Sequence, residues 1–221
     1  MKFNLFLFTL FICYLGFAQL PKGFVYANDI IPDLVVDLRY YSSNNFVGKP
    51  IDGYNNKCLI LTKNTTSALK VIQDELRKKN LGLKVYDGYR PQRAVNHFIS
   101  WARDLNDTIN KSRFYPDVDK KNLFKEEYIA SRSGHTKGST VDLTIMNLDT
   151  MEDLDMGSNY DFFGMQSWVD YEDITNEQKA NRQLLQDVML KNGFRNYPKE
   201  WWHFTQRSEL FPDTYFDFPI E

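Results

Sequence analysis

Apolar residues recur at helical spacing in several stretches of the chain. A first helix is predicted over residues 65–78, where the apolar residues Leu69, Val71, Ile72 and Leu76 recur at helical spacing. A second helix is predicted from Pro91 to about residue 105, because proline suits the first turn of a helix. The spacing therefore predicts two helices in the first half of the chain.

A third helix is predicted from its N-terminal cap. Thr175 and Gln178 match a capping box, in which each side chain bonds to the backbone of the other residue. Gly193 is expected to end this helix, since glycine tolerates the left-handed conformation that follows a last turn. Its buried face is predicted to contain Leu184, Leu185, Val188 and Met189.

β-branched and aromatic residues outside these helices favour strands. Strands are predicted over residues 34–41, 83–86, 140–146 and 194–204. Residues 44–54, which carry two glycines and a proline, are expected to form a loop, and residues 106–130 to form surface loops. Helices precede strands, and the strands near the C-terminus follow a hairpin pattern. We therefore expect an α+β fold with a central, mostly antiparallel sheet flanked by helices.

The N-terminus has the pattern of a secretory signal peptide. Lys2 precedes the almost wholly apolar run Phe3–Leu15, and the small residues that follow predict cleavage after Ala18. The run is shorter than the roughly 20 residues of a membrane span, which disfavours an uncleaved anchor. Cys13 is a poor lipidation site because a bulky residue precedes it. These features predict a periplasmic or secreted protein that is not stably inserted in a membrane, with residues 19–221 as one domain.

Composition disfavours some classes of partner and site. The formal net charge is −2, or −3 without Lys2, and no basic stripe is present to bind nucleic acid or anionic lipid. Cys58 would be the one cysteine left after cleavage, so no intrachain disulfide is expected. Its apolar neighbours favour a buried structural thiol over a nucleophile. Stability must then come from a core, which the 15% aromatic content can supply.

Candidate chemistry lies in two short segments. The chain has three histidines, of which His135 precedes Asp142 in one segment and His203 follows Glu200 in the other. Two imidazoles and one carboxylate suit zinc, and a further carboxylate is what metal-assisted hydrolysis requires. Asp142 lies between apolar residues of a predicted strand, where a charge is costly unless it is paired or bound to a metal. Taken singly, a surface histidine and a solvent-facing aspartate are the alternative explanations.

Glu200 and His203 leave a structural question open. On a helix, residues three apart share a face, whereas on a flat strand they point to opposite faces. If this segment is a strand, it must bend or end between Glu200 and His203 for the two side chains to lie in one pocket. Trp201 and Trp202 would exclude water, and low polarity raises the proton affinity of a carboxylate, which suits Glu200 as a general base.

The two segments together resemble a known signature. Ser133–Asp142, followed later by Glu200–His203, is similar to the D-alanyl-D-alanine dipeptidases, which are zinc peptidases of the VanX type. That family is related in fold to the D,D-carboxypeptidases and the hedgehog signalling domain. Further segments resemble the family in the same order, namely Asp37–Tyr40, Asn45–Pro50, Asp52–Tyr54, Asp87–Pro91, Met156–Ser158 and Tyr160–Phe162. Thr140 departs from the pattern, since the family often has alanine there.

The resemblance implies a set of ligands and catalytic groups. His135, Asp142 and His203 would hold one zinc ion per chain, with the fourth position open to water and the scissile carbonyl. Glu200 would take a proton from the zinc-bound water and pass it to the departing amine. Arg90 would stabilise the oxyanion of the tetrahedral intermediate.

The substrate implied by the resemblance is the small dipeptide D-alanyl-D-alanine, and residues 19–221 would form the catalytic domain. Asp161 would bind its free amino group, and Ser133 would lie near the bound dipeptide. The ordinary alternatives are a solvent-facing Asp161 and an Arg90 that serves only as a salt-bridge partner. His97 is expected to be a structural or surface residue rather than a ligand.

Two other functions share these motifs. A D,D-carboxypeptidase would act on peptidoglycan stem peptides, and the amine-binding group expected at Asp161 argues against it. A non-catalytic, zinc-stabilised binding module of the same fold would have no need of Glu200. The leading prediction from sequence is therefore an exported zinc dipeptidase.

Overall fold

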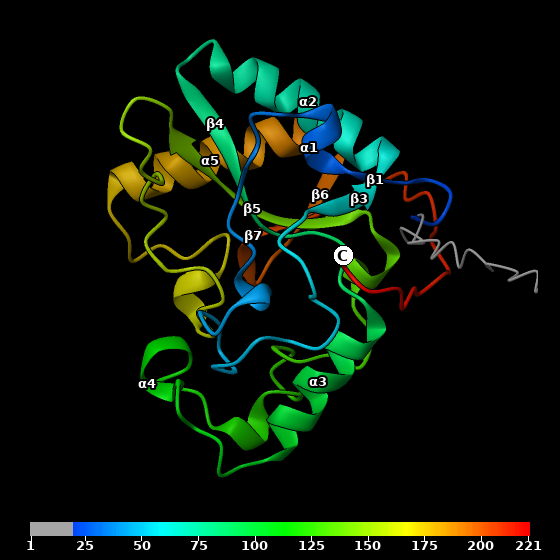
Figure 1. Ribbon diagram of the computed structural model, residues 1–221. Coiled ribbons are helices and arrows are strands. Elements are labelled where there is room, and N and C mark those ends of the chain that lie inside the picture. The colour runs from blue at the N-terminus through cyan, green and yellow to red at the C-terminus, as the bar shows by residue number, and fades with distance from the viewer. Residues whose placement is uncertain (1–19) are drawn as a thin grey trace, which may run out of the picture.

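The computed structural model describes residues 20–221 (Figure 1). Its α-helices are α1 (Ala27–Ile30), α2 (Lys63–Arg77), α3 (Gln92–Arg103), α4 (Lys111–Phe114) and α5 (Asn176–Lys191). Its 3-10 helices are η1 (Arg39–Tyr41), η2 (Lys120–Asn122), η3 (Gly134–Lys137) and η4 (Met165–Ser167). Its strands are β1 (Phe24–Tyr26), β2 (Val35–Val36), β3 (Ile60–Thr62), β4 (Leu81–Asp87), β5 (Thr140–Asn147), β6 (Phe194–Tyr197) and β7 (Glu200–Gln206). Within the described residues, no helix is long and apolar enough to cross a membrane.

A five-stranded sheet organises the molecule. Its strand order is β2-β4-β5-β7-β6, and neighbouring strands are antiparallel except for β2 beside β4. β1 and β3 form a separate antiparallel pair. Figure 1 shows α2 and α5 on one side of the sheet, with α3 and α4 on the other. The predicted α+β fold with a mostly antiparallel sheet is confirmed.

Two hydrophobic clusters form the core. The first joins the sheet to the apolar faces of α2 and α5, and includes Leu69, Leu143 and Val188. The second is rich in aromatic side chains and gathers around α3. There the ring of Phe46 lies 5.0 Å, centroid to centroid, from the rings of both Phe98 and Trp101. Burial of this apolar surface is the main source of stability.

The three predicted helices are confirmed, with small shifts at their ends. The helix predicted over residues 65–78 is α2, in which Val71 is exposed while Leu69, Ile72 and Leu76 are buried. The helix predicted from Pro91 is α3, with Pro91 as its N-cap rather than its first residue. Thr175 and Gln178 form the predicted capping box of α5. On its inner face Leu184 is only partly buried, while the other predicted positions are buried.

The predicted strand over residues 34–41 is largely wrong. β2 contains only Val35 and Val36, and the chain then turns into η1. Tyr40 in η1 is buried, and its hydroxyl donates to the carboxylate of Asp161, far along the chain. This long-range contact outweighs the local β-propensity, which depends strongly on packing context.

The prediction that residues 106–130 form only surface loops is also wrong. The segment contains α4 and η2, and it buries Phe114, Tyr115, Leu123 and Ile129 in the aromatic cluster. These apolar residues lack a helical or strand period, so the pattern of the sequence does not reveal that they face the core.

Cys58 is half-buried rather than fully buried, and its thiol lies 3.7 Å from the carbonyl oxygen of Glu221. Burial, together with the charge of Glu221, raises the pKa of this thiol, which agrees with a structural rather than a nucleophilic role. The predicted signal peptide lies outside the described residues.

We predict that Gly138→Ala destabilises the protein strongly. Gly138 ends η3 with a φ of +76°, and an added Cβ would lie 2.2 Å from a ring carbon of Phe24. The free energy of unfolding should fall by at least about 3 kcal/mol, since backbone strain and overpacking act together.

Gly193→Ala is the matched control for this substitution. Its φ is +88°, but no atom lies within 4 Å of the added Cβ, so strain of about 1 kcal/mol should be the whole effect. Chemical denaturation of both variants measures the difference. Equal losses would show that contact with Phe24 is not the cause.

Candidate active site

Strand pairing brings the candidate ligands together. Asp142 of β5 is the register partner of His203 of β7 on one side and of Asp87 of β4 on the other. His135 comes from η3, the short helix just before β5. The side chain of Ser133, the N-cap of η3, accepts a hydrogen bond from the backbone N–H of His135. The turn thereby folds the imidazole back over the strand that carries Asp142.

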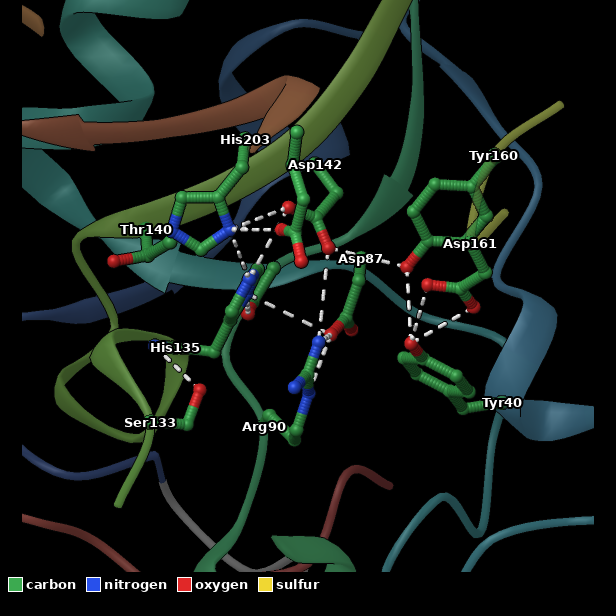
Figure 2. Close-up of polar contacts among 12 residues, drawn as sticks. Tyr40, Asp87, Arg90, Ser133, His135, Thr140, Asp142, Tyr160, Asp161 and His203 are labelled. Carbon is green, nitrogen blue, oxygen red and sulfur yellow. Dashed lines mark hydrogen bonds and ion pairs between the residues drawn. The ribbon is translucent and has the colours of Figure 1, made fainter. Parts of the chain in front are cut away.

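The three side chains converge on one point. Asp142 Oδ1 lies 3.2 Å from His135 Nε2 and 3.0 Å from His203 Nδ1, and the two nitrogens are 3.4 Å apart (Figure 2). Asp142 Oδ1 is buried and has no hydrogen bond of ordinary geometry among the described residues. Burial alone would raise the pKa of Asp142, but His135 and His203 lower it below its usual range. A buried carboxylate oxygen without a partner, facing two imidazole nitrogens, is a donor set that fits zinc.

The tautomer of His135 suits this arrangement. Its Nδ1 lies 2.7 Å from the carbonyl oxygen of Gly88, which can only accept a hydrogen bond. Nδ1 therefore carries the proton, and the lone pair of Nε2 points towards Asp142 and His203. A backbone acceptor on the far nitrogen is the usual way in which proteins orient a metal-binding imidazole.

Glu200 lies at the edge of the cluster, and a bulge explains its position. β6 pairs with β7 at Phe204 and then next at Glu200, so the residues between them leave the β6–β7 ladder, although His203 still pairs with Asp142 of β5. This irregularity is the bend that a strand requires if Glu200 and His203 are to share a pocket. Glu200 Oε2 lies 3.4 Å from His203 Nδ1, and burial raises the pKa of Glu200 to about 7.

Arg90 is fixed by a buried carboxylate. Its Nε and Nη2 each lie 2.9 Å from Asp87 Oδ2, and Nη2 lies 3.6 Å from Asp142 Oδ2. The hydroxyl of Tyr54 donates to the other oxygen of Asp87 at 2.7 Å. Arg90 is thus a salt-bridge partner, as in the alternative drawn from sequence, but the same contacts hold it on the wall of the pocket.

Asp161 is buried, so the solvent-facing alternative is wrong. Its side chain accepts hydrogen bonds from the hydroxyl of Tyr40 at 2.9 and 3.1 Å. The hydroxyl of Tyr160 lies 3.2 Å from that of Tyr40 and 3.1 Å from Asp142 Oδ2, so a chain of polar contacts joins Asp161 to Asp142 (Figure 2). Burial raises the pKa of Asp161 well above its usual range, and the charge of Asp142 raises it further.

All seven predicted site residues line one cavity of about 380 Å³. Aromatic rings form much of the remaining wall, including those of Phe98, Tyr128 and Phe163. His97 lies outside this cavity and accepts a hydrogen bond from the backbone N–H of Asp52, as expected of a structural residue.

The residues that hold the site together were not predicted from the sequence. Three of them, Asp87, Tyr40 and Tyr160, lie within segments that carry the family resemblance. Their place in these segments could have indicated that they belong to the site. Glu127 and Tyr128 also line the cavity, but no local pattern marks them. The hydroxyl of Thr140, the residue that departs from the family pattern, lies 2.9 Å from that of Thr205 on the neighbouring strand.

Comparison with known proteins decides the family. A family model described as D-ala-D-ala dipeptidase, within the M15 peptidases, matches residues 21–221. The chain belongs to this peptidase family. It is 38% identical to a D-alanyl-D-alanine dipeptidase of Enterococcus faecalis over 91% of this chain and 100% of that protein. It is 40% identical to a D-alanyl-D-alanine dipeptidase of Streptomyces coelicolor over 89% of this chain and 98% of that protein. It is 37% identical to one of Enterococcus faecium over 90% of this chain and 98% of that protein.

Membership of the D-Ala-D-Ala dipeptidase family confirms the resemblance seen in the sequence. The match extends over nearly all of the described chain, so the sheet, the aromatic cluster and the cavity all lie within it. The family is one of peptidases, which makes the cavity between η3 and β7 the candidate active site.

We predict that Asp161→Asn stabilises the metal-free protein. Because the folded pKa of Asp161 is raised, folding favours its protonated form, and stability is lost as pH rises through the folded pKa. The neutral amide avoids this loss and can still accept from Tyr40. The melting temperature of Asp161→Asn should exceed that of the wild type by roughly 2–4 °C at pH 8. In a chain of this size, such a shift corresponds to a gain of about 1 kcal/mol in the free energy of unfolding.

Thermal melts of both proteins from pH 4 to pH 8 measure this effect. The difference should widen as pH rises from about 4, because the carboxyl group of the unfolded chain ionises there while that of the folded protein stays protonated, and it should level off above the raised pKa of folded Asp161. A difference that stays constant across the range, or that favours the wild type at high pH, would show that the buried carboxylate carries no penalty.

Proposed function

We propose that this chain is an exported zinc peptidase that hydrolyses the dipeptide D-alanyl-D-alanine. The observation that carries the proposal is the convergence of His135, Asp142 and His203 beside Glu200, in a cavity that also contains the buried carboxylate of Asp161. The names of the relatives from Enterococcus and Streptomyces support this substrate.

His135 Nε2, His203 Nδ1 and Asp142 Oδ1 are the atoms that would hold the metal. When bound, zinc supplies a Lewis acid that polarises the scissile carbonyl and lowers the pKa of water. The donor set fits such a cation, because the buried Asp142 Oδ1 has no hydrogen-bond partner of ordinary geometry among the described residues and lies close to both imidazole nitrogens.

Glu200 is the proton carrier of the proposed reaction. Its carboxylate takes a proton from the attacking water and delivers it to the nitrogen of the departing D-alanine. Its position at the edge of the cluster leaves one side of the carboxylate facing the cavity, where the substrate would lie. A carboxyl group whose pKa is raised to about 7 can both accept and release a proton near neutral pH.

Arg90 stabilises the negative charge that develops on the carbonyl oxygen. Asp87 binds Nε and Nη2 of the guanidinium, which fixes its orientation before the substrate arrives. Preorganised charge of this kind acts on the transition state without reorganisation and is often the largest catalytic contribution. Asp87 is therefore the residue that positions Arg90.

Asp161 binds the free amino group of the dipeptide. An ammonium group would neutralise its buried carboxylate, and the hydroxyl of Tyr40 holds that carboxylate in place. A longer peptide would bring an uncharged amide to this position and leave the buried charge without a partner, which is costly. This favours a dipeptidase over a D,D-carboxypeptidase.

We predict that Glu200→Gln lowers kcat on D-alanyl-D-alanine at least about a hundredfold while zinc content stays at that of the wild type. Release of D-alanine and metal analysis of the purified protein measure the two quantities. Glu177→Gln, in the first turn of α5 and outside the cavity, is the control and should keep full activity.

Other results of this assay would reject the proposal. Faster cleavage of a pentapeptide ending in D-Ala-D-Ala than of the dipeptide would favour a D,D-carboxypeptidase. Bound zinc with no turnover of either substrate would favour a non-catalytic binding module.

Export is proposed from the N-terminal sequence. The apolar run Phe3–Leu15 and the small residues after it support cleavage after Ala18. We predict that protein purified from the periplasm or medium of an expressing bacterium begins at Gln19. N-terminal sequencing or the intact mass measures this, and a chain recovered from the cytoplasm with Met1 to Ala18 still attached would contradict it.

A further inference from the structure

The charges on the wall of the cavity are not distributed evenly. The wall contains two guanidinium groups, of Arg90 and Arg132, and four carboxylates, of Glu127, Asp142, Asp161 and Glu200. Arg90 is buried and bound to Asp87. Arg132 is exposed at the mouth of the cavity, and among residues 20–221 no carboxylate lies within ion-pair distance of it.

A neighbouring aromatic ring holds Arg132 without using its donors. The guanidinium carbon lies 5.3 Å from the centroid of the ring of Tyr215, in the C-terminal segment. Stacking on an aromatic face restrains a guanidinium while leaving its N–H groups free for an acceptor. Arg132 is thus a positioned cation on the cavity wall with unused hydrogen-bond donors.

Arg132 directly precedes Ser133, and both residues line the cavity. Figure 2 shows Ser133 and Asp161 on opposite sides of the cluster, with His135 and Asp142 between them. The hydroxyl oxygen of Ser133 accepts from the backbone of His135, so its own proton is available to an acceptor in the cavity.

A dipeptide has charges that match this layout. Its ammonium group and its carboxylate lie at opposite ends, with the scissile peptide bond between them. If the ammonium group binds Asp161 and the scissile carbonyl lies at the metal cluster, the carboxylate extends towards Ser133 and Arg132. A carboxylate pairs well with a guanidinium, because the two groups can form parallel hydrogen bonds.

We infer that Arg132, together with Ser133, binds the C-terminal carboxylate of the substrate and restricts this enzyme to peptides with a free C-terminus. The inference rests on the proposed function, since it takes the orientation of the dipeptide from Asp161 and the metal cluster. It adds a residue at the opposite end of the cavity that selects the substrate and takes no part in the bond cleavage.

The test compares D-alanyl-D-alanine with D-alanyl-D-alaninamide, which lacks the negative charge, on the zinc-loaded enzyme. Arg132→Ala should raise KM for the dipeptide about tenfold with little change in kcat, the loss expected for a partly exposed hydrogen bond to a charged group. KM for the amide should not change, so the preference for the free acid should fall about tenfold. Arg132→Lys should restore part of the preference, because it keeps the charge but loses the parallel hydrogen bonds.

Arg113→Ala is the matched control. Arg113 is also an exposed arginine stacked on an aromatic ring, with its guanidinium carbon 4.7 Å from the ring centroid of Phe114, but it lies outside this cavity. It should leave the KM values for both substrates unchanged.

The outcomes separate this inference from the proposed function. A wild-type enzyme that cleaves the dipeptide, with an Arg132→Ala variant that keeps the same KM and the same preference for the free acid, would overturn the inference alone. Equal loss on both substrates would also overturn it, because it would indicate a structural role. A wild-type protein with no activity on the dipeptide would overturn the proposed function itself. If the amide is not cleaved, calorimetric binding of the dipeptide to zinc-loaded Glu200→Gln, with and without Arg132→Ala, gives the same tenfold comparison.

Discussion

A single buried carboxylate, that of Asp142, sets the conditions for the rest of the site. It lies in the middle of a sheet, where an ionised group is costly without compensation. The two imidazoles beside it provide that compensation, and together the three groups form a site that suits a divalent cation. β7 must bulge to bring His203 and Glu200 there, and η3 must turn back over β5 to bring His135. The local irregularities of the fold are those that this one cluster requires.

The residues around the cluster form a second level of organisation. Asp87 binds Arg90, Tyr54 binds Asp87, and Tyr40 binds Asp161, so Arg90 and Asp161 on the cavity wall are each held by another buried polar group. Such connected networks are rigid when every member has a partner. The aromatic cluster around α3 supplies the low polarity in which these interactions are strong. The result is a cavity in which buried neighbours hold the charged groups of Arg90 and Asp161 before any ligand binds.

The candidate metal ligands could be predicted before the fold was known, because they lie in short motifs. His135 and Asp142 are close in the chain, as are Glu200 and His203, and each pair stands out against its apolar or glycine-rich surroundings. The amphipathic spacing of α2 and the capping box of α5 were equally visible, since both depend on residues one or two turns apart. The extended strand expected over residues 34–41 was wrong because the burial of Tyr40 depends on Asp161, which no local pattern connects to it.

By itself, then, the sequence determined the class of fold and the family and indicated the candidate ligand set, all of which depend on local spacing and on short motifs in a given order. Only the tertiary structure decided that Glu200 begins a bulged strand rather than a helix, that Asp87 binds Arg90, and that Arg132 and Asp161 line the same cavity. These relations join residues that are distant in the chain, and their geometry depends on how the sheet and the aromatic cluster pack. Hydrophobic periodicity specifies which face of an element is buried, but not which polar groups meet across the core.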